Sequence, residues 1–149
     1  MTGLKELGMK GFSMKIGTLA AALALFIASP GAAEEAAWTL VIHGGAGDIT
    51  RDQISAEKDA LLRAGLQRAL AAGGDVLERG GTAVEAVEAA VRILEDDPNF
   101  NAGRGAVLTE NGTAELDASI MDGETRRAGA VAVVTTTRNP VSLARTIMA

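Results

Sequence analysis

Cysteine is absent from this chain of 149 residues, and histidine occurs only once, at His43. Without cysteine the chain can form neither a disulfide framework nor a thiolate zinc site. A single histidine excludes histidine-rich metal sites and any catalytic pair of histidines. Aromatic residues make up 3% of the sequence, too few for the platforms on which nucleic-acid bases stack. The net charge of −5 also argues against nucleic acid as a partner.

The remaining composition is that of a folded domain. Apolar residues account for 48% of the sequence and charged residues for 22%. The apolar fraction is high enough to build a core, and it excludes a disordered chain. The length corresponds to one domain rather than several.

The N-terminal stretch differs from the rest of the chain. Three lysines precede an uncharged apolar run at residues 16–28, the small residues Gly31 and Ala33 follow, and charge resumes at Glu34. This order predicts a secretory signal peptide over residues 1–33. The run is shorter than the ~20 residues that a membrane-spanning helix needs. We therefore expect a periplasmic or secreted protein with no membrane attachment after cleavage; the alternative is an uncleaved membrane anchor.

The first half of the remaining chain shows one strand pattern and one helix pattern. The β-branched run at residues 38–42 predicts a buried strand that enters a glycine-rich turn at residues 43–47. Leucines at a spacing of four predict a helix that follows the N-cap Ser55 and continues to Arg79. Gly73-Gly74 predicts a bend or a break in this helix.

A second helix is predicted after Thr82, because Glu85 three residues later completes a capping box. It ends before Pro98, since proline disfavours helical backbone in the residue that precedes it. Its glutamates are expected to form a solvated face opposite an apolar stripe of Val84, Val87, Val91 and Leu94.

Strand patterns fill most of the C-terminal third. Runs at residues 106–109 and 114–121 flank Asn111-Gly112, which is a strong hairpin signal. Asp122-Gly123 predicts a second turn, and a third run follows at residues 128–137. These patterns predict a small antiparallel sheet.

A last helix is predicted after this sheet. Asn139 stands at the N-cap position and Pro140 in the first turn. Helices and strands together predict a mixed α/β chain.

The glycine-rich turn at residues 43–47 is open to three interpretations: phosphate binding, backbone donors for an oxyanion, or a tight turn. The Lys-Ser or Lys-Thr pair of a P-loop is absent after Gly47, and so is the Gly-x-Gly-x-x-Gly spacing of dinucleotide-binding proteins. Asparagines in the segment 99–105 either present amides to a substrate or cap backbone groups.

Four motifs stand in a fixed order along the chain. They are His43-Gly44-Gly45-Ala46-Gly47, Asn99-Phe100-Asn101-Ala102-Gly103-Arg104-Gly105, Leu116-Asp117-Ala118-Ser119-Ile120-Met121-Asp122-Gly123, and Ala128-Gly129-Ala130-Val131-Ala132 with Arg138-Asn139-Pro140. In this order the chain, from about Trp38 to Ala149, resembles the plant-type asparaginase and isoaspartyl peptidase family.

The resemblance implies a fold of the α/β class (α+β type), a truncated part of the αββα sandwich of N-terminal-nucleophile hydrolases. Members of the family are precursors that cut themselves into an α and a β subunit, and two αβ pairs form the mature dimer. The new N-terminal threonine attacks the side-chain amide of L-asparagine or the isopeptide bond of β-aspartyl dipeptides. Its own α-amino group serves as the base, so no catalytic cofactor is implied.

The match covers residues 34–149 as the N-terminal portion of the α subunit. The family's nucleophile stands in a Thr-Val-Gly context beyond the position of Ala149. Gly-Thr pairs end here at Thr18, Thr82 and Thr113, and none is followed by Val-Gly. We therefore expect this chain alone to be inactive and to depend on its own β subunit, without which it would aggregate.

The resemblance also assigns roles to individual residues. Asn101 matches an asparagine that lines the active site near the threonine in a supporting role. The loop of His43, Gly44 and Gly45 lies near the nucleophile and matters for maturation. A structural sodium ion is implied, since carbonyl oxygens suit a hard cation. Its main-chain carbonyl ligands would belong to Leu94, Glu95, Asp97, Phe100, Ala102 and Arg104.

Two alternatives stay open. The same fold acts on glycosylated asparagine or on an internal protein bond in the glycosylasparaginase and threonine-aspartase relatives. The chain could instead be a secreted, non-catalytic binding domain, which predicts that residues 34–149 melt cooperatively as a monomer.

Overall fold

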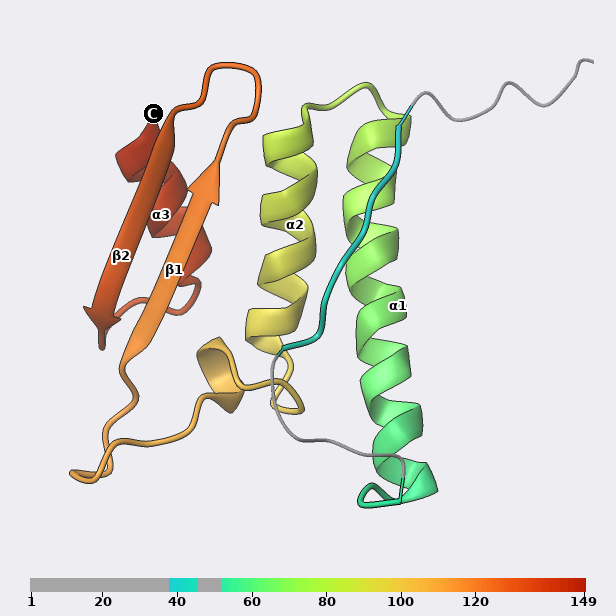
Figure 1. Ribbon diagram of the computed structural model, residues 1–149, viewed down its shortest axis with the longest axis vertical. Coiled ribbons are helices and arrows are strands. Elements are labelled where there is room, and N and C mark those ends of the chain that lie inside the picture. The colour runs from blue at the N-terminus through green and yellow to red at the C-terminus, as the bar shows by residue number, and fades with distance from the viewer. Residues whose placement is uncertain (1–37, 46–51) are drawn as a thin grey trace, which may run out of the picture. The chain divides into compact units, whose positions relative to one another are not determined.

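The computed structural model describes residues 38–45 and 52–149. The predicted signal peptide and residues 46–47 of the glycine-rich turn lie outside this part of the chain. The chain divides into the units Met1–Glu35 and Ala36–Ala149, and only the second is described below. Its elements are, in order, α1 (Ala56–Glu78), α2 (Ala83–Asp96), the short 3-10 helix η1 (Gly103–Gly105), β1 (Leu116–Met121), β2 (Ala128–Val134) and α3 (Pro140–Met148) (Figure 1). None of the helices over these described residues has the length and apolarity required to cross a bilayer.

Helix α1 begins and ends where its sequence predicts. The Ser55 side chain accepts a hydrogen bond from the backbone N–H of Lys58 at 3.1 Å, and Arg79 is the C-cap. Of the bend or break predicted at Gly73-Gly74, the break is wrong, because α1 continues through both residues to Glu78.

The glycines of α1 bring it close to α2. The buried residues of α1 are small: Gly65, Ala69, Gly73 and Gly74. A Cβ atom at Gly73 would lie 3.0 Å from the backbone oxygen of Ala86, which is itself buried on α2. The two helices, which run antiparallel in Figure 1, therefore meet through backbone and methyl groups.

The predicted strand at residues 38–42 is not a strand in the structure. This segment has no ladder partner among the described residues, where β1 and β2 pair only with each other. The segment instead runs along α1 (Figure 1), where Leu40 packs on Gly73 and the Trp38 ring lies near Gly74. The predicted burial of this run is also wrong, since no residue of 38–42 is buried and Val41 is 83% exposed. A strand requires a second strand beside it.

The two strands form an antiparallel hairpin with α3 on one face. Ile120 of β1 is buried with Val141 and Ala144 of α3, and these three side chains are the core of this part of the chain. Gly129 of β2 lies directly against the backbone of Ala144, so even a methyl group would not fit there. The predicted Asp122 turn is confirmed, with Asp122 N donating to Arg127 O at 2.9 Å.

A β-bulge distorts the far end of this hairpin. The register shifts between Leu116 and Ala118, and Val133 of β2 has a φ of +57°. A β-branched residue rarely adopts this left-handed conformation. The Val133 N–H is held by Asp117 Oδ1 at 2.8 Å, and this bond helps to keep the strained residue in place.

The hairpin predicted at Asn111-Gly112 is confirmed only as a turn. Thr109 N donates to Thr113 O at 2.8 Å and Gly112 has a φ of +73°. Only the bridge Leu108–Ala114 forms around it, so the predicted strand at residues 106–109 is wrong. Leu108 and Ala114 both precede β1 in the chain. Among the described residues, no strand continues their single bridge into a ladder.

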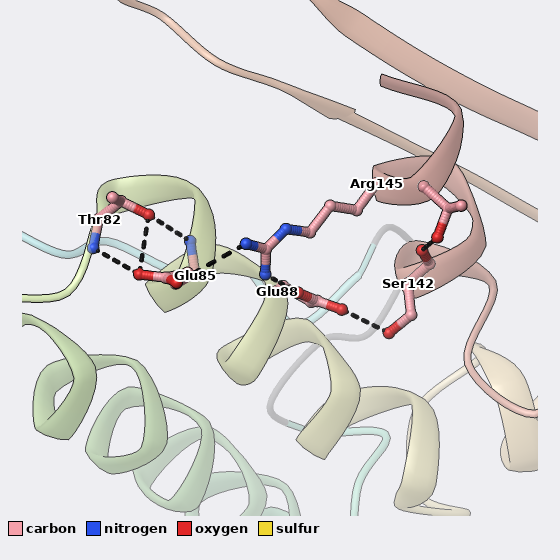
Figure 2. Close-up of polar contacts among 6 residues, drawn as sticks. Thr82, Glu85, Glu88, Ser142 and Arg145 are labelled. Atoms are coloured by element: carbon pink, nitrogen blue, oxygen red, sulfur yellow. Dashed lines mark hydrogen bonds and ion pairs between the residues drawn. The ribbon is translucent and has the colours of Figure 1, made fainter. Parts of the chain in front are cut away.

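Polar contacts join α2 to α3 (Figure 2). The capping box is confirmed: Thr82 Oγ1 accepts from Glu85 N at 3.2 Å, and Glu85 Oε2 accepts from Thr82 N at 2.8 Å. One turn further on, Glu88 accepts hydrogen bonds from Ser142 Oγ at 2.6 Å and from the guanidinium of Arg145. The glutamates of α2 therefore face a second helix as well as solvent, because α3 lies beside them.

We expect Gly65→Ala to destabilise the fold and Gly74→Ala to stabilise it. Alanine is favoured over glycine inside a helix by about 1 kcal/mol. At Gly65 the added Cβ would lie 2.5 Å from the buried Phe100 ring, whereas at Gly74 it would meet only Trp38 at 3.6 Å. Overpacking against the ring costs about 1–3 kcal/mol. Urea unfolding of the protein tests both signs, and two changes of the same sign would contradict this packing.

We expect Glu88→Gln to lower the free energy of unfolding by about 1–2 kcal/mol at neutral pH, the value of hydrogen bonds to a charged group. Burial alone would raise the pKa of Glu88, but hydrogen bonds from Ser142 and Arg145 outweigh it and lower that pKa. The charged carboxylate therefore stabilises the fold above the unfolded pKa, and this stability is lost as the pH falls through the folded pKa.

Urea midpoints between pH 7 and pH 3 should thus show the wild type and Glu88→Gln converging at low pH. Glu110→Gln, in an exposed turn, is the control. Equal differences from wild type at both ends of the range would show that the charge of Glu88 contributes nothing.

Candidate functional site

The segment between α2 and β1 carries most of the residues assigned to a site. Asp97 ends α2 as its C-cap and is buried, with 7% of its surface exposed. Asp97 Oδ1 accepts from the backbone N–H of Asn99 at 2.9 Å and from Asn99 Nδ2 at 2.8 Å. Asp97 Oδ2 accepts from Arg68 of α1 at 2.6 Å. Burial would raise the pKa of Asp97, but these hydrogen bonds and the nearby guanidinium outweigh it and lower that pKa.

Phe100 joins this segment to the glycine-rich turn. Its ring is 4% exposed and lies against Gly65 of α1. A Cβ atom at Gly44 would lie 3.1 Å from the same ring and 3.2 Å from the side chain of Leu66. The glycine-rich turn and α1 therefore pack on opposite parts of this one buried ring, and small residues are required on both sides.

Glu95 contradicts the expectation of a solvated glutamate face, since it is only 3% exposed. Its Oε1 accepts from the backbone N–H of Val141 at 3.0 Å, and its Oε2 accepts from Asn139 Nδ2 at 3.1 Å. Val141 stands in the first turn of α3, where backbone N–H groups lack a partner within the helix. Asn139 occupies the predicted N-cap position but makes no side-chain cap bond, because its amide is turned toward Glu95 and Asp96. Glu95 therefore caps α3 from another helix.

Asn101 is exposed and anchors the segment that follows it. Its Oδ1 accepts from the backbone N–H of Val107 at 2.9 Å. Asn101, Ala102 and Glu95 line a cavity of about 270 Å³ together with Asp117 and Pro140. An amide donor in a cavity with acidic walls could orient a polar ligand. Whether Asn101 does so stays a prediction.

We call residues 94–104, which carry all six carbonyl groups assigned to a sodium ion, the cation loop. The loop folds back on itself: Gly103 has a φ of +45°, and its Cα lies so close to the Glu95 carbonyl oxygen that a side chain would collide with it. Gly105 lies equally close to the carbonyl oxygen of Phe100. Small residues at these points let main-chain oxygens gather inside the loop.

The donor set of the cation loop fits a hard monovalent cation. Backbone N–H groups within the loop already bind the carbonyls of Leu94, Asp97, Phe100 and Ala102. Each carbonyl oxygen has two lone pairs, so one remains for an ion. Over residues 38–45 and 52–149, no group of three or more acidic or histidine side chains could hold a metal. A cation here would therefore depend on backbone oxygens.

The other predicted site residues lie apart. His43 is exposed, its Nδ1 accepts from Gly45 N at 3.3 Å, and Gly45 has a φ of +117° that suits glycine. His43 lines an apolar cavity of about 170 Å³ along α2, and Arg104 lines another of about 420 Å³ with Arg138. Leu94 of the cation loop lines the same cavity as His43, so this cavity and the Phe100 ring both connect the His43 turn to the cation loop.

The residues that hold the cation loop in place were not predicted from the sequence. Lys58 and Arg68 of α1 both reach this loop, yet their spacing on the helix resembles that of any charged face. The side chain of Asp97 was also passed over, because only its carbonyl was assigned a role. Only the position of Asp97 before Pro98, at a helix end, was a local signal for it.

Comparison with known proteins accounts for this arrangement of motifs. The model of a family described as asparaginase matches residues 36–149. The chain is 50% identical over 110 residues to an isoaspartyl peptidase/L-asparaginase of Homo sapiens, which covers 73% of this chain and 34% of that protein. It is also 50% identical over 109 residues to an isoaspartyl peptidase of Salmonella typhimurium, covering 73% of this chain and 35% of the relative.

The ordered motifs and the family match, on a mixed α/β chain, therefore define the class of this protein as a family of amide hydrolases. The chain belongs to the asparaginase family, whose members include isoaspartyl peptidases. It spans about a third of the length of the relatives that it matches. The prediction of the family is therefore confirmed.

We expect Glu95→Ala to lower the free energy of unfolding by about 2–4 kcal/mol, since it opens a cavity and leaves the Val141 N–H without its acceptor. Glu95→Gln keeps an acceptor and should retain most of the stability. Burial raises the pKa of Glu95 despite the hydrogen bonds from Val141 and Asn139. The contribution of Glu95 is therefore full below the unfolded pKa and is lost as the pH rises through the folded pKa.

Urea midpoints should shift in favour of Glu95→Gln relative to wild type as the pH rises from about 4 to 7, the range above the ordinary pKa of glutamate. This trend is opposite to that expected for Glu88→Gln, so each variant controls for general effects of pH. A difference that did not change with pH would contradict the burial of a titrating carboxyl at this position.

Proposed function

We propose that this chain is the N-terminal part of the α subunit of an exported, self-processing hydrolase. Its substrates are the side-chain amide of L-asparagine and β-aspartyl dipeptides. The observation that carries the proposal is the 50% identity over 109 residues to an isoaspartyl peptidase, of which the chain covers 35%. On this proposal the described residues form part of an αββα sandwich that a β subunit completes.

The nucleophile is a threonine beyond Ala149, at the new N-terminus of the β subunit. Its α-amino group takes the proton from its hydroxyl as the oxygen attacks the substrate carbonyl. No Gly-Thr pair in this chain is followed by Val-Gly, which supports a nucleophile outside it. The chain alone is therefore inactive, and the active form is a dimer of αβ pairs.

The described residues contribute the wall and the support of the active site. Asn101 directs its Nδ2 group toward the nucleophile, while its Oδ1 holds Val107. His43, Gly44 and Gly45 form the turn that acts in maturation, fixed at Gly44 by the Phe100 ring. A sodium ion bound by the carbonyls of the cation loop would hold this wall rigid without taking part in the chemistry.

Two other functions are compatible with the family or the chain. A glycosylasparaginase-type hydrolase would share the fold, and residues of the β subunit would decide between the substrates. A secreted binding domain would require residues 34–149 to fold without a partner, and a sharp, reversible thermal transition of that segment would favour it.

We expect full-length protein, expressed from the reading frame continued past Ala149, to cut itself into two subunits. It should then release ammonia from L-asparagine and free aspartate from β-aspartyl dipeptides. Gel electrophoresis and coupled assays of both products check this. The 149-residue chain, assayed in parallel, should release neither product. Ammonia release by that chain at an enzyme-like rate would overturn the proposal of a nucleophile beyond it.

A further inference from the structure

Two cations of α1 reach across to the cation loop. Lys58 Nζ donates to Asn99 Oδ1 at 3.0 Å and lies 3.4 Å from the Asn99 carbonyl oxygen. Ten residues further along the same helix, Arg68 Nη2 donates to Asp97 Oδ2 at 2.6 Å. We call Lys58 and Arg68 together the α1 clamp.

The α1 clamp acts on one continuous network. Asp97 and Asn99 are bonded to each other through both the backbone N–H and the side-chain amide of Asn99. The network therefore consists, in order, of the Lys58 cation, the Asn99 amide, the buried Asp97 carboxylate and the Arg68 cation. Asp97 is 7% exposed, so its carboxylate is shielded from water although the Arg68 side chain is 58% exposed, and its hydrogen bonds are stronger than those of a carboxylate on the surface.

The network spans the bend at which the loop leaves α2. Leu94 and Glu95 precede this bend on the helix, and Phe100 and Ala102 follow it. The relative placement of the two carbonyl groups before the bend and the two after it therefore depends on the conformation at Asp97–Asn99. A hard cation needs its oxygens at well-defined distances, so a loop that is already shaped binds it more tightly.

We propose that Lys58 and Arg68 are positioning residues that hold the cation loop in its ion-binding shape. They act through Asp97 and Asn99 and contact neither the ion nor the substrate. This inference rests on the cation loop of the proposed function and adds two residues of α1 that the sequence pattern did not single out.

Removal of the clamp changes the affinity for sodium, and the sign of that change shows how the clamp acts. If the clamp positions the loop, its removal weakens sodium binding. If it acted only by charge, removal of a positive group near the loop would tighten the binding of a cation. If it only stabilised the fold, the melting temperature would fall without a change in the sodium dependence.

The experiment measures the melting temperature of the full-length protein during titration with sodium chloride, with choline chloride keeping the ionic strength constant. A ligand at concentration c that binds only the folded state stabilises it by RT ln(1 + c/Kd), so the sodium concentration needed for a given rise in melting temperature reports the affinity. The variants are Lys58→Gln and Arg68→Gln. The control is Arg63→Gln on the same helix, where Arg63 pairs with Asp59 in an exposed i,i+4 ion pair.

We expect both clamp variants to require about tenfold more sodium for the same rise in melting temperature, equivalent to about 1.4 kcal/mol, and Arg63→Gln to match the wild type. Arg68→Lys, which keeps the charge, should recover part of the loss. An unchanged or lower sodium requirement in both clamp variants would overturn the inference, and so would a wild type that sodium does not stabilise more than choline.

Dipeptide hydrolysis in the same preparations keeps this outcome separate from that of the proposed function. Hydrolysis with no sodium-specific stabilisation refutes the positioning role and leaves the hydrolase. Absence of hydrolysis refutes the hydrolase, while the sodium requirements still decide the role of the clamp. If Arg68→Gln fails to fold, Lys58→Gln carries the test, since Lys58 bonds an amide and not the buried carboxylate.

Discussion

The buried carboxylate of Glu95 is the contact on which the arrangement of the described residues most depends. A carboxylate removed from water is costly unless hydrogen bonds compensate it, and here the start of α3 supplies them through Val141 and Asn139. The positive end of that helix also favours a negative charge at this place. α3 in turn buries Ile120, so the hairpin of β1 and β2 is positioned through the same carboxylate. The backbone carbonyl of Glu95 meets Gly103 on its other side, which ties the cation loop to this junction.

A second constraint is the close approach of α1 and α2. Glycine and alanine at the contact bring the helix backbones together, and this brings Arg68 within hydrogen-bond distance of Asp97. Larger residues at Gly65 would displace Phe100, and with it the loop that Phe100 anchors. The small residues of α1 are therefore a requirement of the site as much as of the helix packing.

Under the proposed function, the described residues provide supports around a site whose chemical centre lies outside them. Asn101, the cation loop and the His43 turn are each held by contacts from a different element: Val107, α1 and the Phe100 ring. Rigid supports of this kind suit an enzyme whose nucleophile must be created by self-cleavage at one exact place. Under the proposed function, the segment that completes the site follows this chain.

Features that depend on neighbours along the chain were predictable from the sequence. These include the Ser55 cap, the capping box of Thr82 and Glu85, the Asp122 turn and the family itself, which is defined by motifs in a fixed order. Their physics involves backbone groups only a few residues apart, so the local pattern contains the whole interaction.

Features that depend on distant partners could not be predicted in this way. The pattern of Glu95 matches a solvated helix face, and only α3, more than forty residues later, makes it a buried cap. The apolar run at residues 38–42 has the composition of a strand but packs on the glycines of α1, since a strand forms only beside another strand. The bonds of Lys58 and Arg68 to the cation loop likewise exist only because α1 and α2 lie against each other. Burial and pairing require two parts of the chain to come into contact, and the local sequence pattern describes only one of them.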